Sequence, residues 1–209
     1  MSEIFEIFKS DNYRFGSCSI RLYDRNSAPD DFLIQLYRAA KPRIHSTFCG
    51  MTDTSAAAIT AYLSTRSPLL LMCVDNDQLA GGYEIIGFAY TTLIVGPRIG
   101  TVNPYPGRSA LFGYAYFRPW YGKPEITVTM MLAGIYLFHE LGLVTLQGQS
   151  LPSNQLTRRF LRQFGTRDVG ILPKFLLYNG QLVDSHLSCL FRADFEAYVE
   201  RVLNECSSL

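Results

Sequence analysis

The stretch Ser109 to Gly165 decides the fold. It reads SALFGYAYF (109–117), RPWYGKPEI (118–126), TVTMMLAGIYLFHELG (127–142), LVTLQGQSLP (143–152) and SNQLTRRFLRQFG (153–165). These pieces predict an aromatic strand, a tight polar loop, an apolar helix, a second strand and a capped amphipathic helix. Because a crossover between nearby strands is where a sheet can part and admit a ligand, we expect the functional site here.

The composition indicates one globular domain. The chain has 209 residues, of which 48% are apolar and 18% charged, enough for a sizeable core. We therefore expect a single domain over 1–209. It would carry an N-terminal arm (1–17) and an additional C-terminal helix and tail (193–209).

Charge and cysteine usage argue against several classes of protein. A net charge of +1 gives little support for nucleic acid as a partner. The longest apolar run, Met130 to Phe138, is too short to cross a bilayer. Five scattered cysteines and three separated histidines fit neither a disulfide framework nor a metal site. We expect a cytoplasmic protein with no metal and no membrane contact.

The rest of the chain adds strands and helices around the opening stretch. Ser27 and Pro29 indicate a helix start, and Pro42 ends that helix. Asn179-Gly180 is the strongest hairpin signal. Further strands are expected from Cys18, at LLLMCVD (69–75) and at YEIIGFAYTTLIVG (83–96), and a last helix at 194–205. The fold class is mixed α/β: a mostly antiparallel, twisted sheet with helices on both faces.

This order of elements resembles the GNAT (Gcn5-related N-acetyltransferase) superfamily over Cys18 to Phe191. Three local matches support the resemblance: the Gly-Lys loop in FRPWYGKPEI (117–126), Asn154 with Gly165 eleven residues later, and the closing hairpin YNGQLVDSHLSCL (178–190). The resemblance implies a sheet that is splayed between its fourth and fifth strands and holds acetyl-CoA or another acyl-CoA there.

The resemblance also assigns cofactor-binding positions. The pyrophosphate would bind the loop before the helix, where free N–H groups and the helix dipole favour anions. Asn154 would reach the pantetheine amide, and Arg162 the 3′-phosphate. The positions at the end of the fourth strand and in the loop are Tyr116, Phe117, Arg118, Gly122 and Lys123.

Several residues depart from the family pattern. Pro124 removes an N–H donor from the loop, and Glu125 adds a negative charge to the first helical turn. Leu161 occupies the position where many members have a tyrosine that protonates the leaving thiolate. The fourth strand contains no acidic residue.

The usual acid and base are therefore missing, and substitutes must be sought. The candidate catalytic residues are Tyr116, Ser150 and His45, although packing, a turn and a surface position respectively would also explain them. His186, which alternates with Asp184 on the last strand, is a further candidate with a commoner structural explanation.

Two functions from different classes fit these residues. One is an acyl-CoA-dependent N-acyltransferase in which an amine attacks the thioester directly; its acceptor would contact the loop near His45 to Met51 and the final hairpin. The other is an inactive GNAT-fold binding or assembly protein, as a possible homodimer or hetero-complex whose interface uses the N-terminal arm and C-terminal helix. A third variant is an enzyme with an atypical donor or a macromolecular acceptor.

Overall fold

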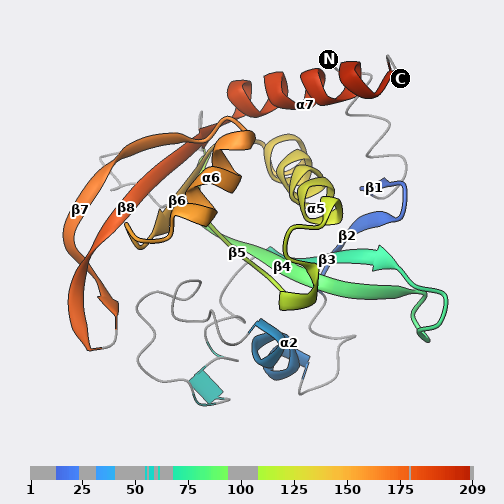
Figure 1. The fold of residues 1–209 in the computed structure, drawn as a ribbon, viewed down its shortest axis with the longest axis horizontal. Coiled ribbons are helices and arrows are strands. Elements are labelled where there is room, and N and C mark those ends of the chain that lie inside the picture. The colour runs from blue at the N-terminus through green and yellow to red at the C-terminus, as the bar shows by residue number, and fades with distance from the viewer. Residues whose placement is uncertain are drawn as a thin grey trace, which may run out of the picture.

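The computed structural model describes residues 13–23, 32–40, 55, 57–58, 61, 68–93, 108–178 and 180–207. They contain one eight-stranded sheet of order β1-β2-β3-β4-β5-β6-β8-β7 (Figure 1). Neighbouring strands are antiparallel except β5 and β6, which are parallel. The strands are β1 (Arg14–Phe15), β2 (Cys18–Leu22), β3 (Leu69–Asp75), β4 (Tyr83–Leu93), β5 (Arg108–Tyr116), β6 (Leu143–Ser150), β7 (Arg167–Tyr178) and β8 (Gln181–Phe191).

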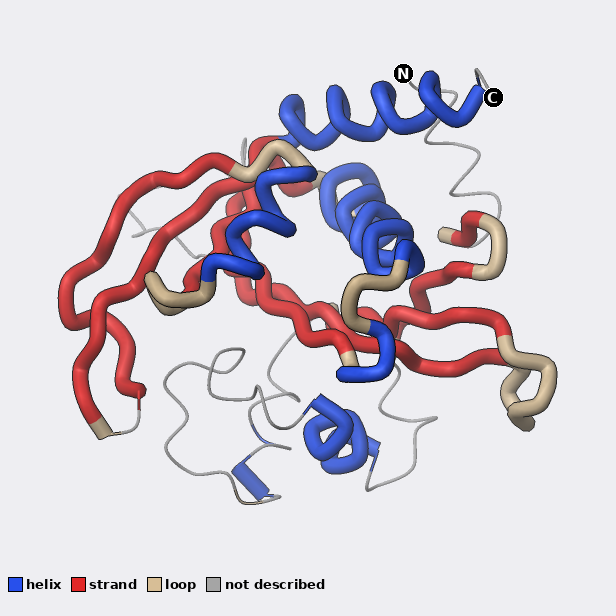
Figure 2. The backbone as a smooth tube through the Cα atoms, in the orientation of Figure 1, coloured by secondary structure: helices blue, strands red, loops and turns tan. Residues whose placement is uncertain are grey.

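Helices cover both faces of this sheet, which confirms the predicted fold class (Figures 1 and 2). One face carries α2 (Phe32–Ala40) and the other carries α5 (Pro124–Ile135), α6 (Gln155–Gln163) and α7 (Arg192–Ser207). A 3₁₀ turn, η1 (Arg118–Trp120), follows β5, and a π-helical turn, η2 (Tyr136–Glu140), extends α5.

Strand β3 shows why a continuous apolar run forms the centre of the sheet. Leu70 and Met72 pack in the core beneath α5, whereas Leu71 and Cys73 pack in the core beside α2. Side chains alternate between the two faces of a strand, so a strand covered on both faces needs apolar residues at every position. The sequence LLLMCVD meets that requirement.

Helix α5 is apolar because it lies between the sheet and α7. Pro124 occupies its first turn, as expected for a residue with no N–H to satisfy. Near its other end a Cβ on Gly134 would lie 2.5 Å from the Phe195 ring, so only glycine allows this approach of α5 and α7. Among the described helices, none combines the length and apolar character needed to cross a membrane.

The closing hairpin is confirmed, since Tyr178 pairs with Gln181. Its first strand is longer than expected and already begins at Arg167. The strand contains Pro173, which is tolerated because β7 is the outer strand of the sheet. The register also shifts between Leu172 and Leu176, which accommodates the proline in a bulge.

Candidate functional site

The parallel strands β5 and β6 separate at their carboxyl ends. Their pairing runs to Leu111 and Gln147 and stops there, although β5 continues to Tyr116 and β6 to Ser150. The last residues of both strands therefore face a gap in the sheet instead of each other. Counted from the strand at Cys18, β5 and β6 are the fourth and fifth strands. The gap between them is therefore the predicted splay.

The gap exposes backbone groups of β5. The N–H of Phe117 donates to Ile86 O on β4 at 2.9 Å. Because the N–H and C=O groups of successive strand residues point to opposite edges, those of Tyr116 and Tyr114 point toward β6. The pairing of β5 with β6 ends at Leu111, so β6 does not bond the N–H and C=O groups of Tyr114 and Tyr116. They can therefore hydrogen-bond a ligand that enters the gap.

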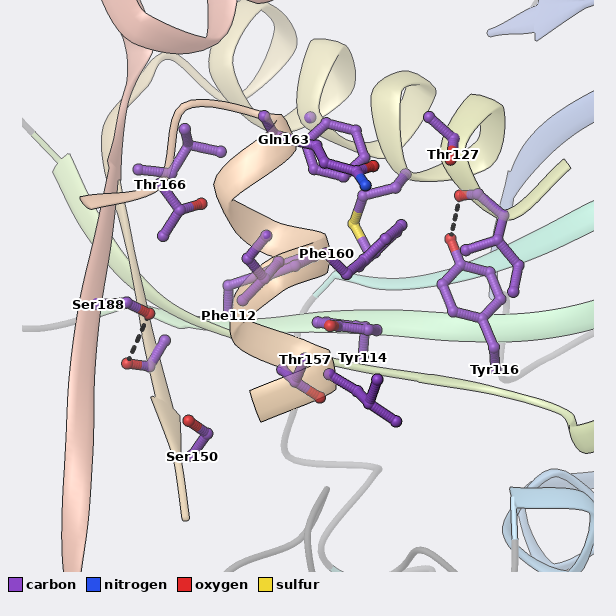
Figure 3. Close-up of a pocket in the computed structure, with 18 of the residues that line it drawn as sticks. Phe112, Tyr114, Tyr116, Thr127, Ser150, Thr157, Phe160, Gln163, Thr166 and Ser188 are labelled. Atoms are coloured by element: carbon purple, nitrogen blue, oxygen red, sulfur yellow. Dashed lines mark hydrogen bonds between the residues drawn. The ribbon is translucent and has the colours of Figure 1, made fainter. Parts of the chain in front are cut away.

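A cavity of about 600 Å³ occupies this position between α5, α6 and the sheet (Figure 3). Gly122, Lys123 and Asn154 line it together with both strand ends, whereas Phe112 and Phe160 give it an aromatic interior. Of the described residues that line the cavity, none is Asp, Glu or His. The cavity thus offers shape and hydrogen-bonding groups, but no obvious general base in its wall.

The loop before α5 places positive charge beside this cavity. Gly122 has φ +80°, a conformation that favours glycine, and Lys123 forms the N-cap of α5. The Lys123 ammonium lies 4.2 Å from the centre of the Trp120 ring. The indole Nε1 of Trp120 in turn donates to Glu84 Oε1 at 3.1 Å. The loop is therefore anchored to β4.

Glu125 lies outside the cavity wall. Burial raises the pKa of the Cys18 thiol on β2, and the negative charge of Glu125 raises it further. The Glu125 carboxylate is thus near β2, and it is not among the groups that line the cavity. Glu125 therefore adds no carboxylate to the described lining of the cavity, whereas Pro124 does line it.

Asn154 caps helix α6 at the cavity mouth. Its Oδ1 accepts a hydrogen bond from the N–H of Thr157 at 3.4 Å. The cap uses the carbonyl oxygen, so the amide N–H₂ is the part of the side chain suited to an incoming acceptor group. Leu161, one turn further along the same helix than Thr157, also lines the cavity.

Tyr116 contributes its ring to the cavity and its hydroxyl to α5. The hydroxyl donates to Ile126 O at 2.8 Å and lies 3.1 Å from Thr129 Oγ1. Burial raises the pKa of Tyr116 well above its ordinary value, and the Thr129 hydrogen bond only partly offsets this. Burial likewise raises the pKa of Tyr114. Neither phenol ionises readily.

The other residues singled out in the sequence divide into three groups. Ser150 lines the cavity and is 8% exposed. Phe117 packs in the α2-side core, Arg118 opens η1, and Arg162 is paired with Asp168 on β7; these three are not among the lining residues. His45 lies outside the described residues, as does the whole loop 41–54 that contains it.

The sequence singled out Ser150 and His186 separately, but it did not reveal that they lie near each other or that Asp168 joins them. Ser150 on β6 pairs with His186 on β8, and His186 Nε2 lies 3.3 Å from Asp168 Oδ1 on β7. Burial lowers the pKa of His186; Asp168 opposes this effect, while Arg158 and Arg162 add to it. The period-two pattern of DSHLS was the available signal, but it does not reveal which residues of other strands lie opposite.

Metal ligands do not gather in the described part of the chain. Within it, no three His, Cys, Asp or Glu side chains are placed to hold a metal ion.

The sequence matches no protein-family model, and no curated protein matches it. Solved structures do match the fold. Ribosomal-protein-S5-alanine acetyltransferase from Vibrio fischeri superposes with a TM-score of 0.63 at 13% identity, covering 87% of this chain and 97% of that one.

Two further structures were solved with CoA or a CoA derivative. Mycobacterium smegmatis RimJ, in complex with CoA-disulfide, gives a TM-score of 0.61 at 19% identity over 85% of this chain and 83% of its own. Spermidine N-acetyltransferase from Vibrio cholerae, in complex with CoA and spermine, gives a TM-score of 0.62 at 17% identity. The match covers 86% of this chain and 98% of that one. Identities this low establish the fold alone. The chain has the fold of the GNAT superfamily.

Proposed function

We propose that the protein is an acyl-CoA-dependent N-acyltransferase that passes an acyl group, acetyl in the simplest case, to an amine. One observation carries this proposal: the cavity between the parted ends of β5 and β6, which opens beside the N-terminus of α5. Strand edges, a helix N-terminus and an apolar interior together match the amide, phosphate and hydrocarbon parts of an acyl-CoA.

Each part of the donor has a matching group in the chain. The N-terminus of α5 and the Lys123 ammonium suit the pyrophosphate. The free edge of β5 suits the pantetheine amides, which would pair with it as an added strand does. The N–H of Tyr116 faces the gap and would hydrogen-bond the carbonyl oxygen as negative charge develops on it. Asn154 would bind a pantetheine carbonyl.

The reaction is a direct transfer. The amine nitrogen attacks the thioester carbon, and a tetrahedral intermediate forms with its charge on the oxygen. The C–S bond then breaks and CoA leaves as a thiolate that must be protonated. The chain's contribution is to hold both reactants in contact, which by itself supplies a large part of the acceleration.

The structural neighbours support an amine acceptor. One is a spermidine N-acetyltransferase solved with CoA and spermine, and another is a ribosomal-protein-S5-alanine acetyltransferase. Both are only fold-level relatives, so for this chain the acceptor class is part of the proposal.

Acetyl-CoA binding and turnover test the proposal in two steps. Saturation at 100 times Kd stabilises a protein by about 2.7 kcal/mol, so a clear rise in Tm is expected with acetyl-CoA. Release of the CoA thiol should then accelerate when spermidine or an alanine-ended peptide is added, compared with the same mixture without amine. The absence of any Tm shift at millimolar acetyl-CoA would contradict the proposal.

A second candidate is an inactive binding or assembly protein. The specific observation in its favour is that the lining residues include Leu161 and, among those described, no Asp, Glu or His. Its expected result is a Tm shift with acetyl-CoA without thiol release, together with a dimer or hetero-complex that is lost when the N-terminal arm (1–17) is removed.

A further inference from the structure

We propose that Ser150, His186 and Asp168 form the proton relay of this acyl transfer. Ser150 would contact the reacting groups, while His186 and Asp168 would act through it as positioning residues. The inference rests on the proposed N-acyltransferase function and deepens it, because it names the groups that replace the acid and base absent from the cavity wall.

The reaction needs a proton acceptor that the cavity wall does not supply. The described lining residues include no carboxylate and no imidazole. The hydroxyl of Tyr116 is tied to Ile126 O, and its pKa is raised by burial. Lys123 lies at the mouth, beside the Trp120 ring. Among the described residues, a base for the reaction would therefore act through a residue that lines the cavity.

Ser150 is that lining residue, because it is the cross-strand partner of His186. The two are opposite each other in the last pair of the β6–β8 ladder. Side chains of such a pair lie on the same face, with Cβ atoms about 4.5–5.5 Å apart. Ser150 lines the cavity, whereas His186 is 5% exposed and does not. The proposed relay uses the Ser150 hydroxyl as the link between the cavity and the imidazole.

The partners of His186 indicate which ring nitrogen carries the proton. Nε2 lies 3.3 Å from Asp168 Oδ1, and a nearby carboxylate favours the tautomer that carries its proton on Nε2. Nδ1 then carries the lone pair. It is buried and has no hydrogen-bond partner in the structure. A buried acceptor without a partner typically costs about 1–3 kcal/mol, and the Ser150 hydroxyl is the group placed to satisfy it.

Burial favours the neutral imidazole, and the charges around it act in both directions. Asp168 faces it from β7, and Arg158 and Arg162 face it from α6; β6 carries no charged residue. Arg162 is ion-paired with Asp168 Oδ2, which holds that carboxylate ionised. The two guanidinium groups disfavour an imidazolium, and Asp168 stabilises it once it forms. The same division of roles operates between the histidine and aspartate of serine hydrolases.

The relay balances the protons of the transfer. As the amine nitrogen bonds to the thioester carbon, its extra proton passes to Ser150 Oγ while the Oγ–H proton passes to His186 Nδ1. When the C–S bond breaks, the proton returns through Ser150 to the sulfur and CoA leaves as the thiol. No oxidant, reductant or third reactant is needed.

The test measures CoA release from acetyl-CoA and spermidine by the full-length protein. Loss of a general acid–base group costs about 10²- to 10⁴-fold, so kcat should fall by that factor in His186→Gln and in Ser150→Ala. The KM for acetyl-CoA and its Tm shift should stay within about twofold. Ser150→Thr, which keeps the hydroxyl, should retain most of the activity.

His139→Gln is the matched control. His139 is also near a carboxylate, at 3.3 Å from Glu196 Oε1, and burial lowers its pKa as well. It differs from His186 in that Glu196 and Arg192, which contact it, do not line the cavity. Ser150, opposite His186, does. This variant should keep the native kcat.

The pH profile separates a relay from a structural role. The native kcat/KM should fall as the pH drops through the pKa of His186, and this acidic limb should be missing in His186→Gln. Protonation of the amine affects the pH profiles of both proteins alike. The difference between the two profiles therefore reports the protonation of His186.

Each outcome has a definite meaning. A His186→Gln variant with native kcat and native pH profile overturns the relay and leaves the proposed function standing. No turnover by the native protein with any amine overturns both. If His186→Gln fails to fold, the Asp168→Asn variant tests the relay instead, because the Asp168 side chain is 36% exposed and tolerates substitution. An unchanged kcat in this variant overturns the relay.

Discussion

The hydroxyl of Tyr116 donates to the carbonyl oxygen of Ile126 over 2.8 Å, and this bond joins the end of β5 to the first turn of α5. Thr129 completes the arrangement, since its Oγ1 lies 3.1 Å from the same hydroxyl and donates to Glu125 O at 2.8 Å. The strand that borders the cavity and the helix whose N-terminus opens on it are thereby held in one geometry. A donor molecule would meet a preorganised site.

Tyr116→Phe should lower stability and leave chemistry nearly intact. Removing one buried hydrogen bond costs about 0.5–1.5 kcal/mol, which urea denaturation will detect. We expect kcat to change by no more than a few-fold, because the hydroxyl is directed at α5. A loss of about 100-fold in kcat with native stability would instead establish the catalytic role that the sequence predicted for this residue.

Gly122→Ala should weaken acyl-CoA binding through the shape of the loop. Gly122 has φ +80°, and a left-handed conformation costs a residue with a Cβ roughly 1–2 kcal/mol. The variant should relieve this by moving the loop, with a higher Kd for acetyl-CoA in calorimetry. Gly82→Ala is the matched control, as Gly82 has φ +70° and does not line the cavity. It should lose stability but not affinity.

Lys123→Gln and Arg118→Gln should separate the two cations near the loop. Lys123 lines the cavity and Arg118 does not. An exposed charge pair contributes about 1 kcal/mol or less, so Lys123→Gln should raise the Kd for acetyl-CoA by up to about fivefold. The effect should shrink in high salt. An equal loss in Arg118→Gln would show that both side chains bind the donor, as the sequence predicted.

Stability should fall on mild acidification because two histidines are held neutral. Burial lowers the pKa of His186 and of His139 below the ordinary 6.5. In that range the unfolded chain binds more protons than the folded one, so the stabilisation is complete above pH 6.5 and is lost as the pH falls toward the folded pKa values. In urea midpoints measured between pH 7.5 and 5, His186→Gln should show a shallower decline than the native protein. A steeper decline would contradict the direction of the shift.

Signals confined to a few neighbouring residues predicted most of the fold. LLLMCVD required a strand buried on both faces, Asn179-Gly180 required a tight hairpin, and Pro124 and Asn154 mark helix starts that the structure confirms. Strand β7 shows the opposite case. It contains Pro173, and only its position at the edge of the sheet, with a bulge, makes a strand possible.

The same division applies to the site. The sequence by itself determined the crossover at Ser109 to Gly165 and the placement of Gly122, Lys123 and Asn154 around it, because each depends on one turn or one helix cap. Tertiary structure alone decided which side chains enter the cavity. Strand alternation directs Phe117 to the other face, and Arg162 is turned toward Asp168. Ser150, His186 and Asp168 belong to three strands, and they meet only because β8 pairs between β6 and β7, a long-range register that no local pattern specifies.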